Sequence, residues 1–442
     1  MPVLMLCSNL LLPLAAASDD SRKYVFAHYM VCCPAAGGGA TVEDYQRDIQ
    51  EAQRRGLDGF ALNCGGWTAK EPHYKARTLL LYEAAKQLGT DFKLFLSADY
   101  CCGLSLDETA DMIRTFQDHP NQFRYQGKPV LSTFSGAGAD NTQGRALIDF
   151  LNREFPDGHG GRNVVFVPFF YPRPNITELP TQTHVDQVFD TFPDLDGFFL
   201  FGAAGTGEAL AQCNALAAQK WRGAGKLYMA GLTPFYRGLG GNYRVFETKG
   251  FGALRAEWLA AIENDANWVE IVTWNDWGEA SYVGPCEANL WGGNWGTLPS
   301  HVGYLDASRY YLDWFKHGAP PAIERDSLYY FYRPHSKDLQ GRRKPKEDFP
   351  ERPSGADRLI DAVWVTCYLT APATLTMTCG EATETRELVA GPNDLQLPCA
   401  LGTPRFVLMR EGKVVLERTG ELAIGTDTST NFNYFAGGGA AE

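Results

Sequence analysis

The chain has 442 residues, of which 45% are hydrophobic and 21% are charged, and its net charge is -12. This length and composition suit one barrel-sized domain together with a smaller second domain. The negative charge argues against nucleic acid or an anionic membrane surface as a partner, because phosphate groups must be met by basic side chains.

The N-terminus is apolar but too short to cross a bilayer, which predicts a secretory signal peptide over residues 1–17. We therefore expect a secreted, extracellular protein. Loss of Cys7 with this peptide would leave an even number of cysteines, so we expect disulfide bonds. The adjacent pairs Cys32-Cys33 and Cys101-Cys102 lack the two-residue gap of a typical metal grip. We expect no metal site.

Eight short apolar runs rich in β-forming residues predict eight strands. They span Tyr24–Met30, Gly59–Asn63, Phe92–Ala98, Pro129–Phe134, Val164–Phe170, Gly197–Phe201, Lys226–Leu232 and Trp268–Thr273. Segments with helical spacing lie between or after them, at Thr41–Arg55, Lys75–Leu88, Leu106–Gln117, Gly144–Glu154, Thr206–Gln219, Leu254–Asn264 and Leu305–His317.

Near-continuous hydrophobic strands that alternate with amphipathic helices indicate a parallel sheet covered by helices. Because there are eight such strands, we expect an α/β fold closed as a (β/α)8 TIM barrel over residues 22–335. The alternative is an open doubly wound sheet, which would carry a spaced Gly-rich turn after its first strand. The run Gly37–Gly39 lacks that spacing.

The last part of the chain has a different pattern. We expect a charged linker over residues 336–354 and a small antiparallel β-sandwich over 355–435, ending in a frayed Gly-rich tail. Its predicted strands are Ala362–Leu369, Ala373–Thr378, Asp394–Leu397, Arg405–Arg410 and Lys413–Glu417. Such a domain could bind polysaccharide or brace the barrel, and the sequence leaves both interpretations open.

The most informative segment is Ile271–Glu279, where Asp276 and Glu279 stand among the tryptophans Trp274 and Trp277 at the end of the eighth predicted strand. Barrel enzymes place their chemistry at the carboxyl ends of the strands. Two carboxyl groups in different protonation states are what glycoside hydrolysis requires. We assign Glu279 as the acid and Asp276 as the base, and the reverse assignment stays open.

Other polar and aromatic residues follow the predicted strands and are candidate sugar contacts. The candidates for hydrogen bonds are His28, Asn63 and Asp99, and the candidates for ring stacking or further substrate contacts are Trp67, Tyr100, Trp274, Asn275, Trp277 and Tyr282. Trp291 and Trp295 stand in a Gly-rich loop that could line the cleft. For each, the alternative is a purely structural role in the barrel.

Four blocks resemble glycoside hydrolase family 71, the fungal endo-α-1,3-glucanases. They are Val25–Val31, Gly56–Asn63, Phe92–Asp99 and Thr273–Glu279, in the family's order. The resemblance implies an endo-acting enzyme that cleaves α-1,3-glucan with inversion, in the cell wall or outside the cell. It also implies that the enzyme needs no cofactor and uses Asp276 and Glu279.

One departure concerns the residues after the Glu, where Ala280-Ser281-Tyr282 replaces the expected Ser-His-Tyr. It leaves linkage specificity open. The alternatives are another endo-acting glycosidase of this architecture, such as an endo-α-mannosidase, and a non-catalytic carbohydrate-binding barrel. We expect a monomer whose partner is α-glucan.

Overall fold

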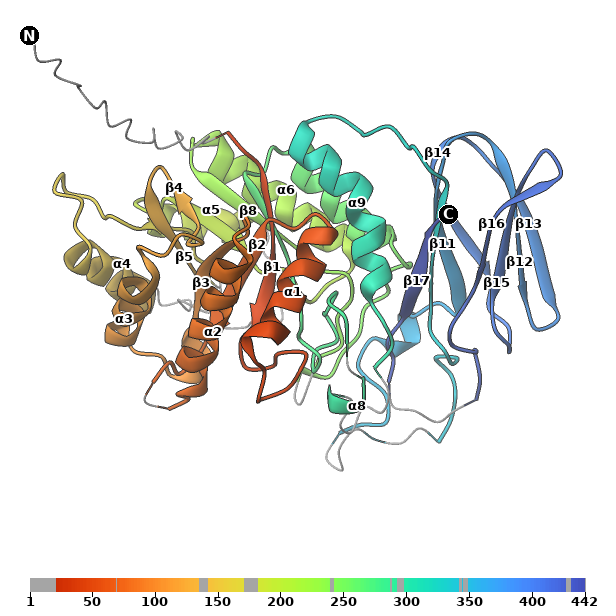
Figure 1. Ribbon diagram of the computed structural model, residues 1–442, viewed down its shortest axis with the longest axis horizontal. Helices are drawn as coiled ribbons and strands as arrows, with labels where there is room; N and C mark the ends of the chain where they lie inside the picture. The colour runs from red at the N-terminus through yellow and green to blue at the C-terminus, as the bar shows by residue number, and fades with distance from the viewer. Residues whose placement is uncertain are drawn as a thin grey trace, which may run out of the picture.

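The computed structural model describes residues 21–68, 70–134, 142–170, 182–238, 242–286, 288–291, 298–341, 344, 349–426 and 431–441. It has two parts, an α/β part and an all-β part, with helix α9 (Val302–His317) between them (Figure 1). The predicted signal peptide and Trp295 lie outside the described residues.

All eight predicted barrel strands are present. They are β1 (Tyr24–Met30), β2 (Gly59–Cys64), β3 (Lys93–Asp99), β5 (Lys128–Phe134), β6 (Val165–Phe166), β7 (Gly197–Leu200), β8 (Leu227–Leu232) and β9 (Trp268–Ile271). They pair in parallel in the order β7-β8-β9-β1-β2-β3-β5, and β6 pairs with β5. A short strand, β4 (Arg124–Tyr125), pairs antiparallel with β5.

The TIM-like sheet curls round but has no ladder between β6 and β7 among the described residues. On that side a backbone hydrogen bond from Phe199 N to Pro168 O, 2.9 Å long, brings the two strands together. β1 and β9 are therefore central neighbours in the sheet, and the residues that follow them share one end of the barrel.

The helices of the α/β part follow the expected alternation. They are α1 (Val42–Arg54), α2 (His73–Leu88), α3 (Leu106–Phe116), α4 (Thr142–Glu154), α5 (Gln182–Thr191), α6 (Gly207–Gly223), α7 (Gly252–Glu263), the short α8 (Ala288–Trp291) and α9. Capping boxes at Thr41 and Ser105 begin α1 and α3. Helix α5 is absent from the sequence-based assignment, because only a few apolar residues mark its buried side.

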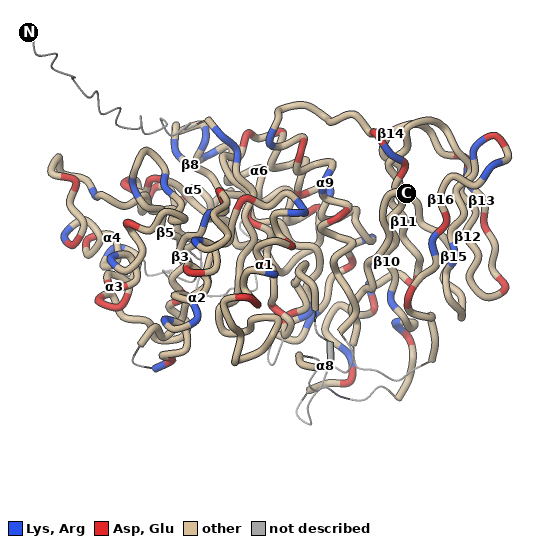
Figure 2. The backbone as a smooth tube through the Cα atoms, in the orientation of Figure 1, with Lys and Arg blue, Asp and Glu red and all other residues tan. Residues whose placement is uncertain are grey.

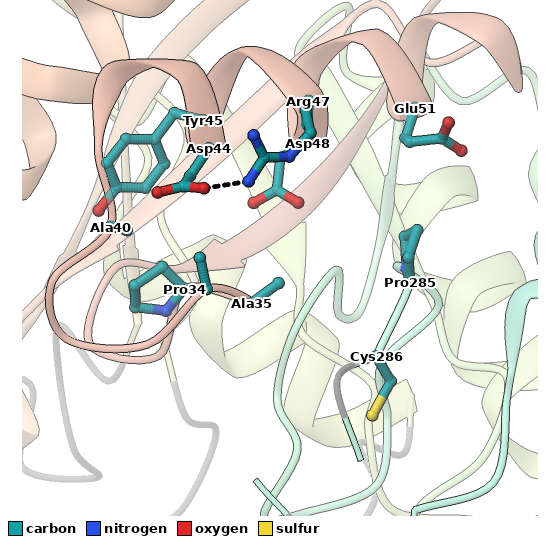
Figure 3. Close-up of a pocket in the computed structure, with 11 residues that line it drawn as sticks. Pro34, Ala35, Ala40, Asp44, Tyr45, Arg47, Asp48, Glu51, Pro285 and Cys286 are labelled. Carbon is teal, nitrogen blue, oxygen red and sulfur yellow. Dashed lines mark hydrogen bonds and ion pairs between the residues drawn. The ribbon is translucent and has the colours of Figure 1, made fainter. Parts of the chain in front are cut away.

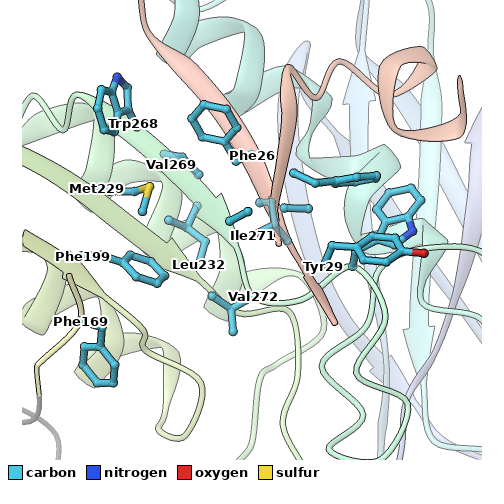
Figure 4. Packing of buried hydrophobic residues seen from close by; sticks show 14 of the residues in the cluster. Phe26, Tyr29, Phe169, Phe199, Met229, Leu232, Trp268, Val269, Ile271 and Val272 are labelled. Atoms are coloured by element: carbon cyan, nitrogen blue, oxygen red, sulfur yellow. The ribbon is translucent and has the colours of Figure 1, made fainter. Parts of the chain in front are cut away.

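The barrel core explains why its strands read as unbroken apolar runs. Strands β2 and β8 are buried at every residue, since helices cover the sheet on its outside and side chains fill its inside. Phe26, Phe199, Met229 and Ile271 meet in this core (Figure 4). The packing holds the ends of β1 and β9 in fixed positions.

The all-β part is an antiparallel sandwich of two four-stranded sheets, as predicted. One sheet has the order β14-β11-β10-β17 and the other β13-β12-β15-β16. The strands are β10 (Ser327–Tyr332), β11 (Ala362–Leu369), β12 (Ala373–Cys379), β13 (Ala382–Leu388), β14 (Gly391–Pro398), β15 (Arg405–Arg410), β16 (Lys413–Thr419) and β17 (Phe435–Ala440).

Three strands of the sandwich differ from expectation. β13 lies at Ala382–Leu388, where no strand was predicted. β10 comes from within residues 22–335, the range expected for the barrel, yet it pairs with β11 and β17. The expectation of a frayed end at Phe435 is wrong, because this segment is β17. Gly437 and Gly438 suit this strand because added side chains would strike the Tyr330 ring and Leu328 O.

Strand β10 also joins the two parts of the molecule. Leu328 and Tyr330 face the core of the sandwich, whereas Tyr329 and Phe331 pack into the barrel cluster. Tyr368 of the neighbouring strand β11 donates a 2.7 Å hydrogen bond to Ala307 O in α9. The sandwich is therefore fixed against the barrel through α9.

Surface charges of both signs are interspersed over both parts (Figure 2). None of the described helices has both the length and the apolar character to cross a bilayer. No disulfide bond joins any two of the ten cysteines in the part of the chain that the structure describes, so none of the predicted disulfides is seen there.

Candidate active site

Residues 273–283 form a turn that follows β9 and is closed by its own hydrogen bonds. We call it the catalytic turn, because catalytic roles are predicted for Asp276 and Glu279 within it. Thr273 N donates to Ser281 O, and Val283 N donates to Thr273 O, each at 3.0 Å. Trp274 N donates to His28 O at 2.7 Å, which attaches the turn to β1. The turn thus presents Asp276 and Glu279 as partly buried side chains at the carboxyl end of the sheet.

Asp276 is built into the turn as a hydrogen-bond acceptor. Its Oδ1 accepts from Glu279 N at 2.8 Å, and its own N–H donates to Thr273 Oγ1 at 2.8 Å. Burial raises the pKa of Asp276 above its usual range, while the hydrogen bond from Glu279 N and the charges of His28 and Arg237 oppose the rise.

Glu279 has a different environment. Burial, followed by the negative charge of Asp276, raises the pKa of Glu279 to about 8. The Tyr236 hydroxyl donates to Glu279 Oε1 at 3.2 Å and in turn accepts from Asn242 Nδ2 at 2.5 Å. Sequence reasoning missed Tyr236, because it lies after β8 in a segment with no recognisable motif.

His28, predicted as a sugar contact, lies fully buried at the end of β1. Its Nδ1 is 2.6 Å from Glu270 Oε1 of β9, and both side chains are 0% exposed. Within the described chain, His28 Nε2 has no hydrogen-bond partner. Glu270 is therefore a site residue that the sequence analysis missed, since it reads as one polar position within a buried strand.

Asn63 and Asp99, also predicted as sugar contacts, meet at the ends of β2 and β3. Asn63 Nδ2 donates to Asp99 Oδ2 at 3.3 Å, and Asp99 Oδ1 accepts from Cys101 N at 2.9 Å. Burial raises the pKa of Asp99, and the hydrogen bond from Cys101 N opposes this. The charge of His28 acts on the pKa of both Asp99 and Asp276, so these groups form one electrostatic cluster.

The structure corrects the prediction for Asn275 and Tyr282. The Asn275 side chain is bound to Met30 N, Met30 O and Cys33 O at 2.7 to 3.0 Å, and Tyr282 donates to Pro299 O at 2.6 Å. Both side chains are buried. Because their polar atoms are used within the protein, these residues hold the turn in place.

The expectation of open stacking faces on tryptophan is also corrected. Trp67, Trp274 and Trp277 are 0%, 0% and 2% exposed. Trp277 donates to Cys33 O at 2.9 Å and packs between Tyr282 and Trp291, so its ring faces are covered by protein. Trp67 donates to Asp111 at 2.7 Å.

Tyr100 and Trp291 are partly buried. The Tyr100 hydroxyl lies 2.8 Å from Thr109 Oγ1, and Trp291 Nε1 donates to Pro34 O and Ala35 O at 3.2 Å each. These two rings retain some exposure and remain the aromatic candidates for sugar contact among the described members of the predicted set.

A cavity of about 400 Å³ lies beside α1 (Figure 3). Pro34 and Ala35 line it on one side, Asp44 and Asp48 of α1 on another, and Cys286 on a third. Neither Asp276 nor Glu279 lines it, so this cavity is not the site of the paired carboxyl groups. Across the described residues, no group of three His, Cys, Asp or Glu side chains could hold a metal ion.

Paired carboxyl groups in different environments, at the carboxyl end of a TIM-like barrel, are an arrangement typical of a glycoside hydrolase. The relatives agree with this class. The chain belongs to glycosyl hydrolase family 71, whose sequence model matches residues 21–442.

Two curated relatives cover nearly the whole chain. A glucan endo-1,3-alpha-glucosidase of Schizosaccharomyces pombe is 31% identical over 95% of this chain and 95% of its own length. A mutanase of Penicillium rubens is 29% identical over 95% of this chain and 88% of its own length. A solved GH99 endo-alpha-mannosidase of Bacteroides thetaiotaomicron is 18% identical, with a TM-score of 0.47 over 68% of this chain and 98% of that one.

Proposed function

We propose that this enzyme cleaves α-1,3-glucan within the chain, with Glu279 as general acid and Asp276 as general base. The substrate is supported by the two relatives, whose names are those of an endo-1,3-alpha-glucosidase and a mutanase. The observation that carries the mechanism is the unequal environment of the two carboxyl groups within one turn.

The acid role falls to Glu279 because its pKa of about 8 keeps it protonated at neutral pH. A protonated carboxyl can deliver its proton to the oxygen of the departing sugar. Tyr236 holds one oxygen of this carboxyl, which fixes the side chain.

The base role falls to Asp276 because its ionised form is stabilised by Glu279 N and by the positive charge of Arg237. An ionised carboxylate can remove a proton from water as the water attacks the anomeric carbon. In an inverting enzyme this water stands on the face opposite the acid, and the product is released with the opposite anomeric configuration.

The test starts with purified enzyme on insoluble α-1,3-glucan, beside β-1,3-glucan, starch and mannan. We expect soluble oligosaccharides from α-1,3-glucan alone, and proton NMR should show β-configured reducing ends first. Release from mannan instead would favour the endo-α-mannosidase alternative, and binding without reducing ends would favour a binding protein.

Variants separate the acid from the base. Asp276→Ala and Glu279→Ala should each lower kcat by about 10² to 10⁴-fold while the protein stays folded. On an aryl α-glucoside oligomer with a nitrophenolate leaving group, Glu279→Ala should regain much of its activity, because such a group leaves without a proton. Recovery in Asp276→Ala instead would reverse the two roles.

Inversion, secretion and a monomeric state are part of the same proposal. Secretion is supported by the apolar N-terminal stretch within residues 1–17. N-terminal sequencing of protein from the culture medium would test it, since an intact Met1 would contradict removal of a signal peptide. Light scattering of the purified enzyme tests the monomeric state.

A further inference from the structure

Besides its internal hydrogen bonds, the catalytic turn is held by a residue from another part of the chain. Arg237, after β8, grips two successive carbonyl groups of the turn. Its backbone N–H donates to Glu279 O at 2.8 Å, and its Nη2 donates to Gly278 O at 3.1 Å. The carbonyl group of Gly278 lies between Asp276 and Glu279 in sequence, and the other belongs to Glu279 itself. Their position therefore fixes the separation of the two catalytic carboxyl groups.

Arg237 is itself held from the C-terminal end of the chain. Its guanidinium is fully buried, and Nη1 donates to Asn431 Oδ1 at 2.7 Å. The same Asn431 oxygen accepts from Asn433 N at 3.0 Å, which fixes the amide toward Arg237. A buried guanidinium needs such acceptors, because its charge is costly away from water.

His301 also links the C-terminal segment to the catalytic turn. The ring of His301 lies with Nδ1 3.0 Å from Tyr282 O of the catalytic turn and Nε2 3.1 Å from Tyr434 O. It stacks on the Tyr282 ring, with centroids 4.2 Å apart and planes 9° apart. Tyr434 is anchored in turn by donating to Glu247 Oε1 at 2.6 Å.

We propose that Arg237 and Asn431 form a clamp through which the C-terminal segment 431–434 positions the catalytic turn. These are positioning residues, since they act on the reacting carboxyl groups through the backbone of the turn. The segment leads directly into β17, so the sandwich takes part in positioning the catalytic turn. The inference rests on the proposed roles of Asp276 and Glu279.

The key variant is Asn431→Ala, which removes the oxygen that accepts from Arg237 Nη1. We expect kcat on a soluble α-1,3-gluco-oligosaccharide to fall by about 10- to 100-fold, because small misplacements of catalytic groups carry penalties of this size, with KM nearly unchanged. Asn431→Asp keeps an oxygen acceptor and should restore most of the activity.

The matched control is Tyr368→Phe, which removes a buried contact between sandwich and barrel away from the catalytic turn. It should lower the melting temperature without changing kcat. An equal loss of kcat in Tyr368→Phe and Asn431→Ala would point to general destabilisation and would overturn the clamp.

A second measurement does not depend on activity. Hydrogen exchange followed by mass spectrometry should show faster exchange of residues 273–283 in Asn431→Ala and unchanged exchange there in Tyr368→Phe. Wild-type kcat together with wild-type exchange in Asn431→Ala would refute the clamp. If the wild-type enzyme left α-1,3-glucan intact, the proposed substrate would fall, and exchange in the turn would still decide the clamp.

Discussion

Replacing Glu279 with Gln should stabilise the folded protein at neutral and alkaline pH while it abolishes hydrolysis. The ordinary pKa of this carboxyl is 4.5, and in the folded protein it is raised to about 8 by burial and by Asp276. Between these two values the unfolded chain has lost the proton and the folded protein still binds it. The free energy of unfolding of the wild type therefore falls as the pH rises through this range.

The size of the effect follows from the two pKa values. The difference between 4.5 and about 8, at about 1.4 kcal/mol per pH unit, sets a ceiling of about 5 kcal/mol. Glu279 is only partly buried, and part of the rise comes from Asp276, so solvent screening and the partner's own titration reduce this value. We expect about 2 kcal/mol in favour of Glu279→Gln at pH 9, and little difference near pH 4.

Urea unfolding of both proteins at pH 4, 7 and 9 measures this difference directly, as the change in midpoint at constant slope. Glu381→Gln, at an exposed position in the turn before β13, serves as the control for removal of a carboxylate in general. The reasoning is refuted if the two proteins differ by the same amount at every pH, or if Glu279→Gln is the less stable protein at pH 9.

Two further outcomes follow from the site. The pH profile of kcat/KM should be bell-shaped, falling on the acid side as Asp276 gains a proton and on the alkaline side near pH 8 as Glu279 loses one. Tyr236→Phe should move the alkaline limb to higher pH, because the Tyr236 hydrogen bond lowers the pKa of Glu279. An alkaline limb that stays in place would contradict this role for Tyr236. Glu270→Gln should lower kcat about 10-fold, because it weakens the contact that orients the His28 ring. It should also shift the acid limb of the pH profile of kcat/KM. An unchanged profile in kinetic assays would mean that the His28–Glu270 pair is purely structural.

The barrel could be predicted because its strands are buried on both faces, so each strand appears in the sequence as one apolar run. Strands β10 and β17 of the sandwich were harder to predict. No strand was predicted at Ser327–Tyr332, and nothing local shows that this run pairs with β11 and β17. The Gly-rich run of β17 has low strand propensity and is accommodated by the close approach of β10.

The residues of the site also fall into two groups, those that a local motif indicates and those that only the fold brings together. Asp276 and Glu279 could be predicted as candidates because one short segment contains both. Tyr236, Arg237 and Glu270 act on them from positions that are remote in sequence or buried in a strand, and only the fold brings them together. Tryptophan beside carboxylates suggested sugar stacking, yet a large apolar ring gains more by burial, which is where Trp274 and Trp277 lie.

The departure at Ala280-Ser281 can now be located. Ser281 is 1% exposed, and its Oγ lies 3.1 Å from Thr273 Oγ1, the same hydroxyl that accepts from Asp276 N. Ser281 thus contacts the residue that supports Asp276, the proposed base, and its side chain is almost fully covered by protein. A change there acts on how firmly Asp276 is held, so it should alter kcat more than the choice between glucan linkages, which must be made by side chains that reach the substrate.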